Sequence, residues 1–249
     1  MSIASKLHSR FRQFGILGTG ILLFDTYINP SQKRIIRIER EFDTMMNVET
    51  NGTMDYGELG LEKNSADTPY RYEPCSINVL HACISELGHI DQYFFIDIGS
   101  GKGRALFGAA RHPFKKVIGI ELSSSAFNIA RSNLQTVKKS LLACHDVELV
   151  RMNALDFEFP MQNLVLWMFN PFNADAMRKM IDKISTQFAN SACYIHLFYL
   201  SPLHYEAVLE NGFFCQKQIK KYRISSQNFD VAFFERKGFC AGKCDCLMS

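Results

Sequence analysis

The chain contains 249 residues, of which 47% are hydrophobic and 21% are charged. This is the composition of an ordinary globular protein, and the length suits one large α/β domain with a small appended segment. The formal net charge of +3 is too small to indicate a nucleic-acid partner by itself.

The first 40 residues are the most basic part of the chain, with seven Lys or Arg residues against two acids, a net of +5. An apolar run at 15–24 lies within them, but it is far shorter than the ~20 residues that span a bilayer. No small-residue cleavage site follows this run. We therefore expect a cytoplasmic protein in which the run packs onto the domain, with a weak contact to a membrane surface as the alternative.

Two helices are predicted ahead of the central part of the chain. The first covers residues 30–46, where apolar residues recur at helical spacing. An irregular region follows it. The second helix is predicted to start at Glu73-Pro74, because proline suits the first turn of a helix, and to end at Gly88.

Strands and helices alternate from Tyr93 onward. The predicted strands are 93–97, 117–122, 147–152, 164–169 and 192–198, and the predicted helices are 103–111, 124–134, 174–188 and 202–211. Two final strands, 213–222 and 229–236, have no helix between them. This pattern predicts a doubly wound, mostly parallel seven-stranded sheet with helices on both faces, an antiparallel C-terminal hairpin and an N-terminal helical extension. A ligand is expected at the carboxyl ends of the strands, where the strand order reverses.

The turn after the first of these strands carries the strongest functional signal. Asp97 ends the strand, and glycines follow at positions 99, 101 and 103. Alternate glycines let the backbone approach a ligand closely, because they have no Cβ. A carboxylate just before them favours a ligand with a cationic or amine group over a bare phosphate. Glu121, at the tip of the next strand, can accept hydrogen bonds from both hydroxyls of a ribose.

These residues carry a family resemblance. The pattern Asp97-x-Gly99-x-Gly101-x-Gly103 with Glu121 resembles the class I S-adenosylmethionine-dependent methyltransferases, and the similarity covers most of residues 70–236. The chain is more similar to a set of poorly characterised bacterial members. Those proteins share a segment like Tyr70-Arg71-Tyr72-Glu73-Pro74 before the glycine turn and an Asn-Pro-Phe after the fourth strand.

The resemblance implies S-adenosylmethionine as the cofactor. Asp97 would then face the ammonium group, the glycines would lie against the methionine portion, and Glu121 would bind the ribose. Asn153 stands where an acid often accepts a hydrogen bond from adenine, and its side-chain oxygen can also accept, with Asp156 as the alternative. Tyr70 and Tyr72 are candidates for a roof over the pocket. The predicted cofactor-binding residues are Asp97, Gly99, Ser100, Gly101, Gly103, Glu121, Asn153, Ala154, Asp156 and Tyr72.

The segment Asn170-Pro171-Phe172 is the predicted catalytic site. It resembles the Asn/Asp-Pro-Pro-aromatic signature of methyltransferases that act on planar amino nitrogens, with one proline instead of two. Asn170 would accept a hydrogen bond from a nucleophilic N–H, and Phe172 would supply an apolar surface. We therefore expect transfer to a nitrogen of a protein side chain or a small molecule. A plain turn with Phe172 in the core is the alternative.

Two other functions share part of this pattern. An NAD(P)-dependent oxidoreductase also has a glycine turn and a strand-end acid, but its third glycine comes one residue later than Gly103. A non-catalytic scaffold of the same fold would keep the cofactor residues without the reaction. A phosphate-binding P-loop is disfavoured, because Lys102 is followed by glycine and not by Ser or Thr. No motif predicts base-specific recognition of nucleic acid.

The sequence divides into three parts: a helical and irregular extension (1–69), a methyltransferase domain (70–237) and a flexible tail (238–249). Most of the eight cysteines lie in apolar segments, so we expect free thiols in a reducing compartment. Cys240, Cys244 and Cys246 in the tail lack a fourth ligand at zinc-ribbon spacing, so no metal site is expected.

Overall fold

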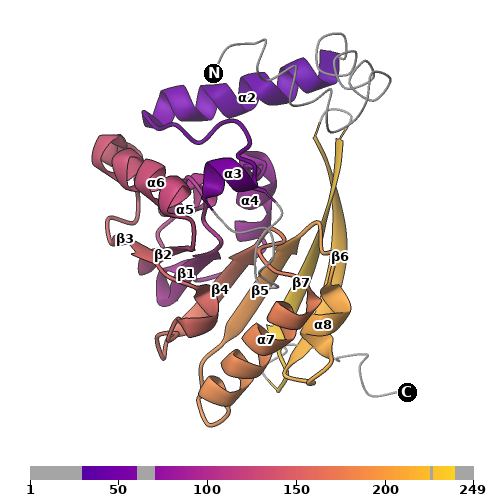
Figure 1. Cartoon of the computed structure of the whole chain (residues 1–249). Helices are drawn as coiled ribbons and strands as arrows, with labels where there is room; N and C mark the ends of the chain where they lie inside the picture. Colours follow the sequence, from indigo (N-terminus) through magenta and orange to yellow (C-terminus); the bar gives the residue numbers. More distant parts are fainter. Residues whose placement is uncertain (1–29, 61–70, 225–226, 239–249) are drawn as a thin grey trace.

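The computed structural model describes residues 30–60, 71–224 and 227–238 (Figure 1). The apolar run 15–24, Tyr70 and the cysteines of the tail lie outside the described residues. Of the described cysteines, Cys75, Cys83, Cys144 and Cys193 are free thiols, as predicted for them. Within the described ranges, no helix is long and apolar enough to cross a membrane.

Seven strands form one sheet, in the order β3-β2-β1-β4-β5-β7-β6. Strands β1 to β5 are parallel to one another, whereas β7 is antiparallel to both β5 and β6. The predicted doubly wound, mostly parallel sheet with an antiparallel C-terminal hairpin is thereby confirmed. The strands are β1 (Tyr93–Ile98), β2 (Lys116–Glu121), β3 (Val147–Arg151), β4 (Asn163–Met168), β5 (Ile195–Leu200), β6 (Phe214–Ile224) and β7 (Gln227–Arg236).

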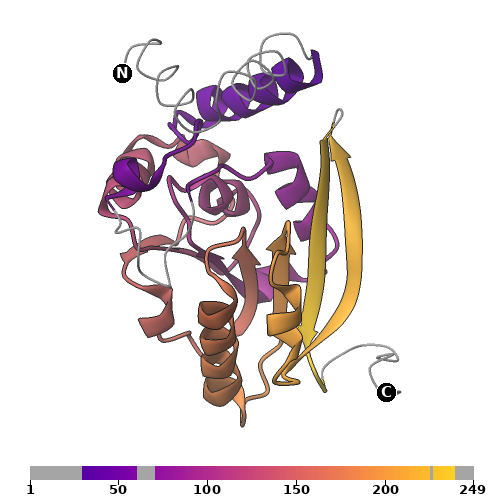
Figure 2. The ribbon, with the colours of Figure 1, turned by 45° about the vertical axis from the view of Figure 1, so that its right-hand side comes forward.

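Helices cover both faces of the sheet. Phe95 of β1 packs in one core with α4 (Ile77–Ile84) and α5 (Arg104–Ala110). Ile96 and Ile98 belong to the core on the other face, with α7 (Ala174–Phe188) and α8 (Tyr205–Leu209). Figure 2 shows the same arrangement from a second direction. Because both faces are covered, the central strands are continuous apolar runs rather than alternating ones.

One more helix and three 3₁₀ turns complete the connections between the strands among the described residues. Helix α6 (Ser124–Thr136) follows β2, and its N-terminus is capped by the Ser123 hydroxyl, which accepts from the Ala126 N–H at 3.2 Å. Three 3₁₀ turns are η1 (Ile90–Gln92), η2 (Lys139–Leu141) and η3 (Ala154–Asp156). The η3 turn directly follows β3 and lies at the carboxyl edge of the sheet.

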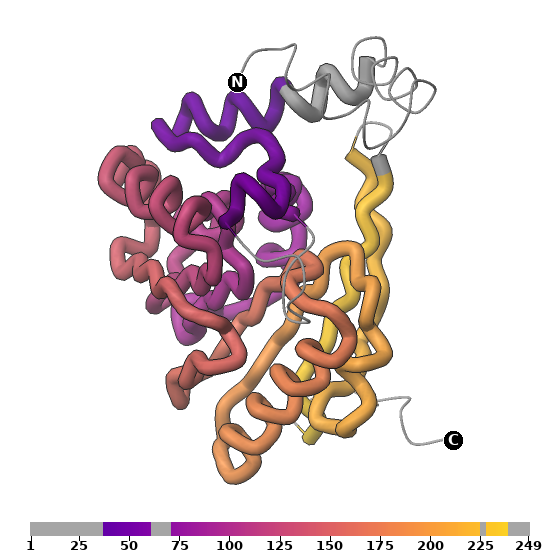
Figure 3. The backbone as a smooth tube through the Cα atoms, viewed as in Figure 1, coloured from indigo at the N-terminus to yellow at the C-terminus, as the bar shows by residue number. Residues whose placement is uncertain are grey.

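The described part of the N-terminal extension, residues 30–60, is packed against the domain. Helix α2 (Pro30–Met46) inserts Phe42 and Met46 into the core that α4 and α5 share. Figure 3 shows the chain after α2 continuing beside α5 and α6. A further helix, α3 (Tyr56–Leu59), lies in the region predicted to be irregular, and a capping box of Asp55 and Glu58 stabilises it. The spacing of those two acids was the available sequence signal.

The helix predicted to begin at Glu73-Pro74 begins later. Residues 73–76 are not helical; α4 starts at Ile77, with Ser76 as its N-cap, and ends at Ile84 before Gly88. The reason is a tertiary contact of Tyr72, whose backbone N–H and C=O both bond to Met54, at 2.9 and 3.1 Å. This isolated antiparallel bridge holds the segment extended.

Strand β5 also begins later than predicted, at Ile195 instead of Ala192. The Arg236 guanidinium donates to the backbone oxygens of Phe188, Ser191 and Cys193 at 2.8, 2.9 and 3.1 Å. These carbonyls accept hydrogen bonds from the buried Arg236 side chain and not from a neighbouring strand, so the strand begins only after them.

The apolar face of α7 should contribute strongly to stability. Ile184 is fully buried in the core beneath α7, so Ile184→Ala should lower the free energy of unfolding by about 2–5 kcal/mol. Lys179→Ala, at an exposed position of the same helix, should change it by less than about 0.5 kcal/mol. Urea denaturation of both variants measures the difference. Equal effects would show that α7 does not pack as described.

Candidate functional site

A cavity opens at the carboxyl ends of the central strands, at the edge where the sequence predicts a ligand. It encloses about 690 Å³, including space open to solvent. Gly99 and Gly101 of the glycine turn, Glu121 of β2 and the loop of Asn170–Phe172 after β4 all line it. The fold therefore brings segments from three strands to one place.

The glycine turn requires glycine at two of these positions. Gly99 and Gly101 have φ angles of 78° and 54°, in the left-handed region that side chains disfavour. A Cβ on Gly99 would lie 2.9 Å from the Cβ of Pro171, and one on Gly101 would lie 2.2 Å from the Tyr72 ring. Backbone conformation and close approach both exclude larger residues here.

Gly103 and Ser100 differ in their relation to the site, because Ser100 lines the hollow beside the cavity and Gly103 does not. Gly103 caps α5 with a φ of 90°, and a Cβ there would lie 2.7 Å from the Phe107 ring. Gly103 lines neither the cavity nor the hollow beside it. Ser100 is buried, and its hydroxyl has no hydrogen-bond partner among the described residues.

Glu121 lies at the tip of β2 and faces the turn. Its Oε2 accepts from the Gly101 N–H at 2.7 Å, and its Oε1 accepts from the Ser123 N–H at 2.7 Å. Burial raises the pKa of Glu121, while these two N–H groups and that of Leu122 act to lower it. A carboxylate has about four lone-pair sites, so the group can still accept a hydroxyl donor.

Asp97 lies in a smaller hollow of about 260 Å³ beside the cavity. The hollow and the cavity share four lining residues, so they lie side by side: Tyr72, Glu73, Gly99 and Phe169. Asp97 is only 4% exposed, and its Oδ2 has no hydrogen-bond partner within the described part of the chain. An unpartnered carboxylate oxygen in a buried hollow is a ready ligand for a cation.

The electrostatic surroundings of Asp97 also favour a cationic ligand. Burial, assisted by the nearby charge of Glu121, raises the pKa of Asp97 from 3.8 to about 8, and the Leu106 backbone N–H opposes this rise only in part. A cationic group beside Oδ2 would favour the charged form of this carboxyl. Asp97 thus fits the ammonium group that the sequence assigns to it.

The segment after β3 forms the next part of the wall. Asn153 and Ala154 line the cavity, whereas Asp156 does not. The Asn153 Oδ1 accepts from the Leu155 N–H at 3.0 Å and so caps η3. Its second lone pair and its amide N–H groups are available to a base. Met152 adds an apolar surface that sequence reasoning missed.

All three residues of the predicted catalytic segment line the cavity. Asn170 has a φ of 46°, and its side chain connects two loops. Its Nδ2 donates to the Ser201 carbonyl at 2.8 Å, and its Oδ1 accepts from the Leu203 N–H at 3.3 Å. Asn170 therefore fixes the loop after β4 to the loop after β5, a contact between positions 31 or more apart in sequence. Phe172 is 6% exposed and forms part of the core as well as the wall.

The segment before α4 closes the cavity on its remaining side. Tyr72 lines both the cavity and the hollow, and Arg71 and Glu73 form an exposed ion pair of 2.6 Å beside it. Leu59, from the unpredicted helix α3, contributes an apolar contact. The N-terminal extension thus supplies part of the wall.

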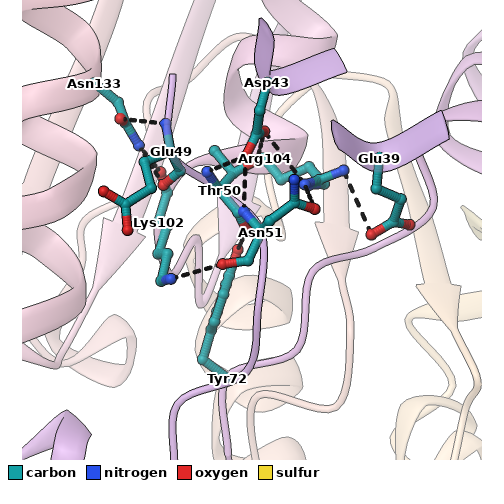
Figure 4. Close-up of polar contacts among 9 residues, drawn as sticks. All are labelled: Glu39, Asp43, Glu49, Thr50, Asn51, Tyr72, Lys102, Arg104 and Asn133. Carbon is teal, nitrogen blue, oxygen red and sulfur yellow. Dashed lines mark hydrogen bonds and ion pairs between the residues drawn. The ribbon is translucent and has the colours of Figure 1, made fainter. Parts of the chain in front are cut away.

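Lys102 and Arg104 are buried, with exposures of 6% and 1%, and Figure 4 shows both directed toward the N-terminal segment. Lys102 Nζ donates to the Asn51 carbonyl at 2.8 Å. The Arg104 guanidinium forms an ion pair with Asp43 at 3.3 Å. Sequence reasoning missed these partners, because they lie about 50 to 60 positions upstream and no local pattern connects them.

Comparison with known proteins adds independent support. Residues 95–191 match a family model described as a methyltransferase domain, and this range contains every predicted site residue except Tyr72. No curated protein matches the chain.

Several solved structures have a similar fold. Magnesium protoporphyrin IX methyltransferase from Synechocystis PCC 6803, with bound SAM, has a TM-score of 0.48 at 12% identity, over 64% of this chain and 77% of that one. TrmN from Thermus thermophilus has a TM-score of 0.48 at 16% identity, over 65% of this chain and 49% of that one. A SAM-dependent methyltransferase from Leishmania major has a TM-score of 0.49 at 10% identity, over 64% and 70%.

The strand order, the glycine turn and the domain match agree with one another. The part of the chain that matches the methyltransferase domain, residues 95–191, lies within this doubly wound sheet and contains the glycine turn. The domain match also supports S-adenosylmethionine as the cofactor, as the sequence predicts.

The raised pKa of Asp97 predicts a pH-dependent stability. The folded protein binds a proton at this carboxyl between pH 3.8 and about 8, where the unfolded chain does not, so stability falls as pH rises through this window. Asp97→Asn removes the charge, so at pH 8 its free energy of unfolding should exceed that of the wild type by more than about 1 kcal/mol. Denaturation of the ligand-free proteins at pH 5 and pH 8 tests this. A difference that does not shrink at pH 5 would contradict it.

Proposed function

We propose that the protein is an S-adenosylmethionine-dependent methyltransferase that transfers a methyl group to a nitrogen of a protein side chain or a small molecule. The observation that carries the proposal is the buried carboxyl of Asp97, which lines a hollow directly beside the cavity and whose Oδ2 has no hydrogen-bond partner among the described residues. That arrangement suits a ligand with a cation at one end.

The residues present fit this cofactor. Asp97 would hold its ammonium group, and the glycine turn would accept its methionine portion against bare backbone. Glu121 would bind the ribose through the lone pairs that Gly101 and Ser123 leave available. Asn153, Ala154 and the apolar Met152 would surround the adenine.

S-adenosylmethionine, when bound, would supply a sulfonium methyl group for an in-line displacement, in which the C–S bond breaks as the N–C bond forms, a neutral thioether leaves and the acceptor nitrogen loses a proton to solvent. The chain's own residues then have to bind, orient and exclude water. Asn170 holds its loop rigidly through Ser201 and Leu203, and its Oδ1 retains a lone pair that can align an N–H of the acceptor. Pro171 and Phe172 provide apolar surface beside it. These features support a nitrogen acceptor.

The two alternative functions have less support. In a dinucleotide-dependent oxidoreductase the third glycine would come one residue later than Gly103, which here caps α5 against Phe107. A non-catalytic scaffold would share the cofactor residues, so only turnover distinguishes it. The methyltransferase remains the function that the site residues favour.

Cofactor binding gives the first test. Calorimetry of the wild type should show binding of S-adenosylmethionine, and at pH 7 this binding should release protons, because Asp97 must ionise to pair with the ammonium group. Asp97→Ala and Glu121→Ala should each weaken binding about 10- to 100-fold. Glu148→Gln, a half-exposed carboxylate on the adjacent strand, is the matched control and should bind normally. Tight binding of NADH without binding of S-adenosylmethionine would overturn the proposal.

Turnover gives the second test. A cell extract supplied with the protein and a labelled methyl donor should yield a labelled product, and the position of the label identifies the acceptor atom. With that acceptor, Asn170→Ala should lower kcat about 10- to 100-fold because both the loop anchor and the acceptor contact are lost. Labelled nitrogen is the expected outcome. Labelled carbon or oxygen would refute the nitrogen assignment, and binding without any label would favour the scaffold.

A further inference from the structure

A network of buried polar groups connects the N-terminal extension to the glycine turn (Figure 4). Its members on the N-terminal side are at positions 39–51, outside the residues 95–191 that match the methyltransferase domain. Its members on the other side are Lys102 and Arg104, in and directly after the turn. The domain's cofactor turn is thus held by residues that the domain match does not include.

Asp43 of α2 is the centre of the network. Its carboxylate accepts hydrogen bonds from the Thr50 N–H at 2.8 Å, the Asn51 N–H at 2.9 Å and the Thr50 hydroxyl. It also pairs with Arg104 Nη2 at 3.3 Å. Asp43 therefore sets the conformation of the loop after α2 and attaches that loop to α5.

Arg104 is the first residue of α5, directly after the glycine turn. Its side chain is 2% exposed, and a guanidinium removed from water needs close anionic or polar partners. Those partners are Asp43, Glu39 at 3.6 Å and the Asn51 side-chain oxygen at 2.7 Å. Every one of these groups comes from the N-terminal extension. The start of α5 therefore depends on the extension, which both covers Arg104 and supplies the groups that pair with it.

Two further contacts fix the turn itself. Lys102 Nζ donates to the Asn51 carbonyl at 2.8 Å. The Asn133 side chain of α6 donates to the carbonyls of Glu49 and Lys102, both at 3.0 Å, and accepts from the Glu49 N–H at 2.8 Å. The loop after α2 and the glycine turn therefore share one set of hydrogen bonds.

Tyr72 extends the network to the cavity. Its hydroxyl donates to the Thr50 carbonyl at 2.7 Å, and burial raises its pKa, so the hydroxyl remains a donor. Its ring lies directly against Gly101 and within 5.5 Å of Lys102 Nζ. The Gly101 N–H in turn donates to Glu121 Oε2. A continuous path of contacts leads from Asp43 through Thr50, Tyr72 and Gly101 to Glu121, the residue predicted to bind the ribose.

We propose that Asp43 and Arg104 are positioning residues for the cofactor, and that α2 with the loop after it is an integral part of the cofactor site. Asp43 acts through Thr50 on Tyr72, and Arg104 acts through α5 on the glycine turn. The inference rests on the proposed function, because it takes S-adenosylmethionine as the ligand of the turn. It goes beyond that function by assigning the turn's geometry to Asp43 and Arg104. Neither residue lines the main cavity, although Arg104 lines the hollow beside it together with Asp97.

A double-mutant cycle tests the path. Asp43→Asn removes the charge but keeps the shape, and Tyr72→Phe removes only the hydroxyl that contacts Thr50. Each should weaken S-adenosylmethionine binding about tenfold in calorimetry. Because both changes break one path, the double variant should also lose about tenfold, where independent effects would give about 100-fold. Additive losses would overturn the proposed path.

Control variants separate positioning from general stability. Glu41→Gln, whose carboxylate forms an exposed pair with Arg37 on the same helix, should bind like the wild type. Ile38→Ala weakens the packing of α2 on the core without touching the network, so it should lower the melting temperature and leave the dissociation constant unchanged. If Ile38→Ala weakens binding as much as Asp43→Asn, the inference is wrong.

Amide hydrogen exchange measures the local stability of the glycine turn in the ligand-free protein. Amides of residues 98–106 should exchange at least about fivefold faster in Asp43→Asn than in Glu41→Gln, because the turn loses its anchor. Equal exchange would overturn the inference while leaving cofactor binding intact. By contrast, a wild type that does not bind S-adenosylmethionine would overturn the proposed function, so the two failures are distinguishable.

Discussion

The removal of four ionisable side chains from water is the constraint on which the site depends. Asp97, Lys102, Arg104 and Glu121 stand at or beside the glycine turn, and none is more than 6% exposed. A buried charge is costly unless it has a close partner, so each of these groups demands one from elsewhere in the fold. The partners of these four groups explain most of the contacts around the glycine turn.

Three of the four groups find partners within the chain. Glu121 accepts two backbone N–H groups, one of them from the turn itself. Lys102 and Arg104 find theirs in the loop after α2 and in α2. The Oδ2 of Asp97 has no hydrogen-bond partner within the described part of the chain, and Asp97 lines the hollow beside the cavity. Arg104 is only partly satisfied, because its Nε has no hydrogen-bond partner among the described residues and its Nη1 has only the ion pair with Glu39. Asp97 is therefore the acid that is available to a ligand, and the contacts of the other three groups hold the turn in place.

This arrangement trades stability for function. A neutral residue at position 97 would avoid a buried carboxyl whose pKa lies near 8, yet it could not pair with an ammonium group. The N-terminal extension has the opposite effect, since it supplies the anions and carbonyls that make a buried Arg104 tolerable. The domain match at residues 95–191 therefore includes Arg104 but not the groups of the N-terminal extension that pair with it.

The sequence by itself determined the fold class, the succession of strands and helices along the chain, and most of the segments that meet at the cavity. Periodicity of apolar residues and the alternate glycines are local signals, and they depend on neighbours a few positions apart. What only the tertiary structure decided are contacts across long separations: Tyr72 with Met54, which keeps 73–76 out of the helix, Arg236 with the carbonyls before β5, and Asp43 with Arg104. Their energy comes from burying polar groups against distant partners, and no local pattern in a single sequence records which partner will be near.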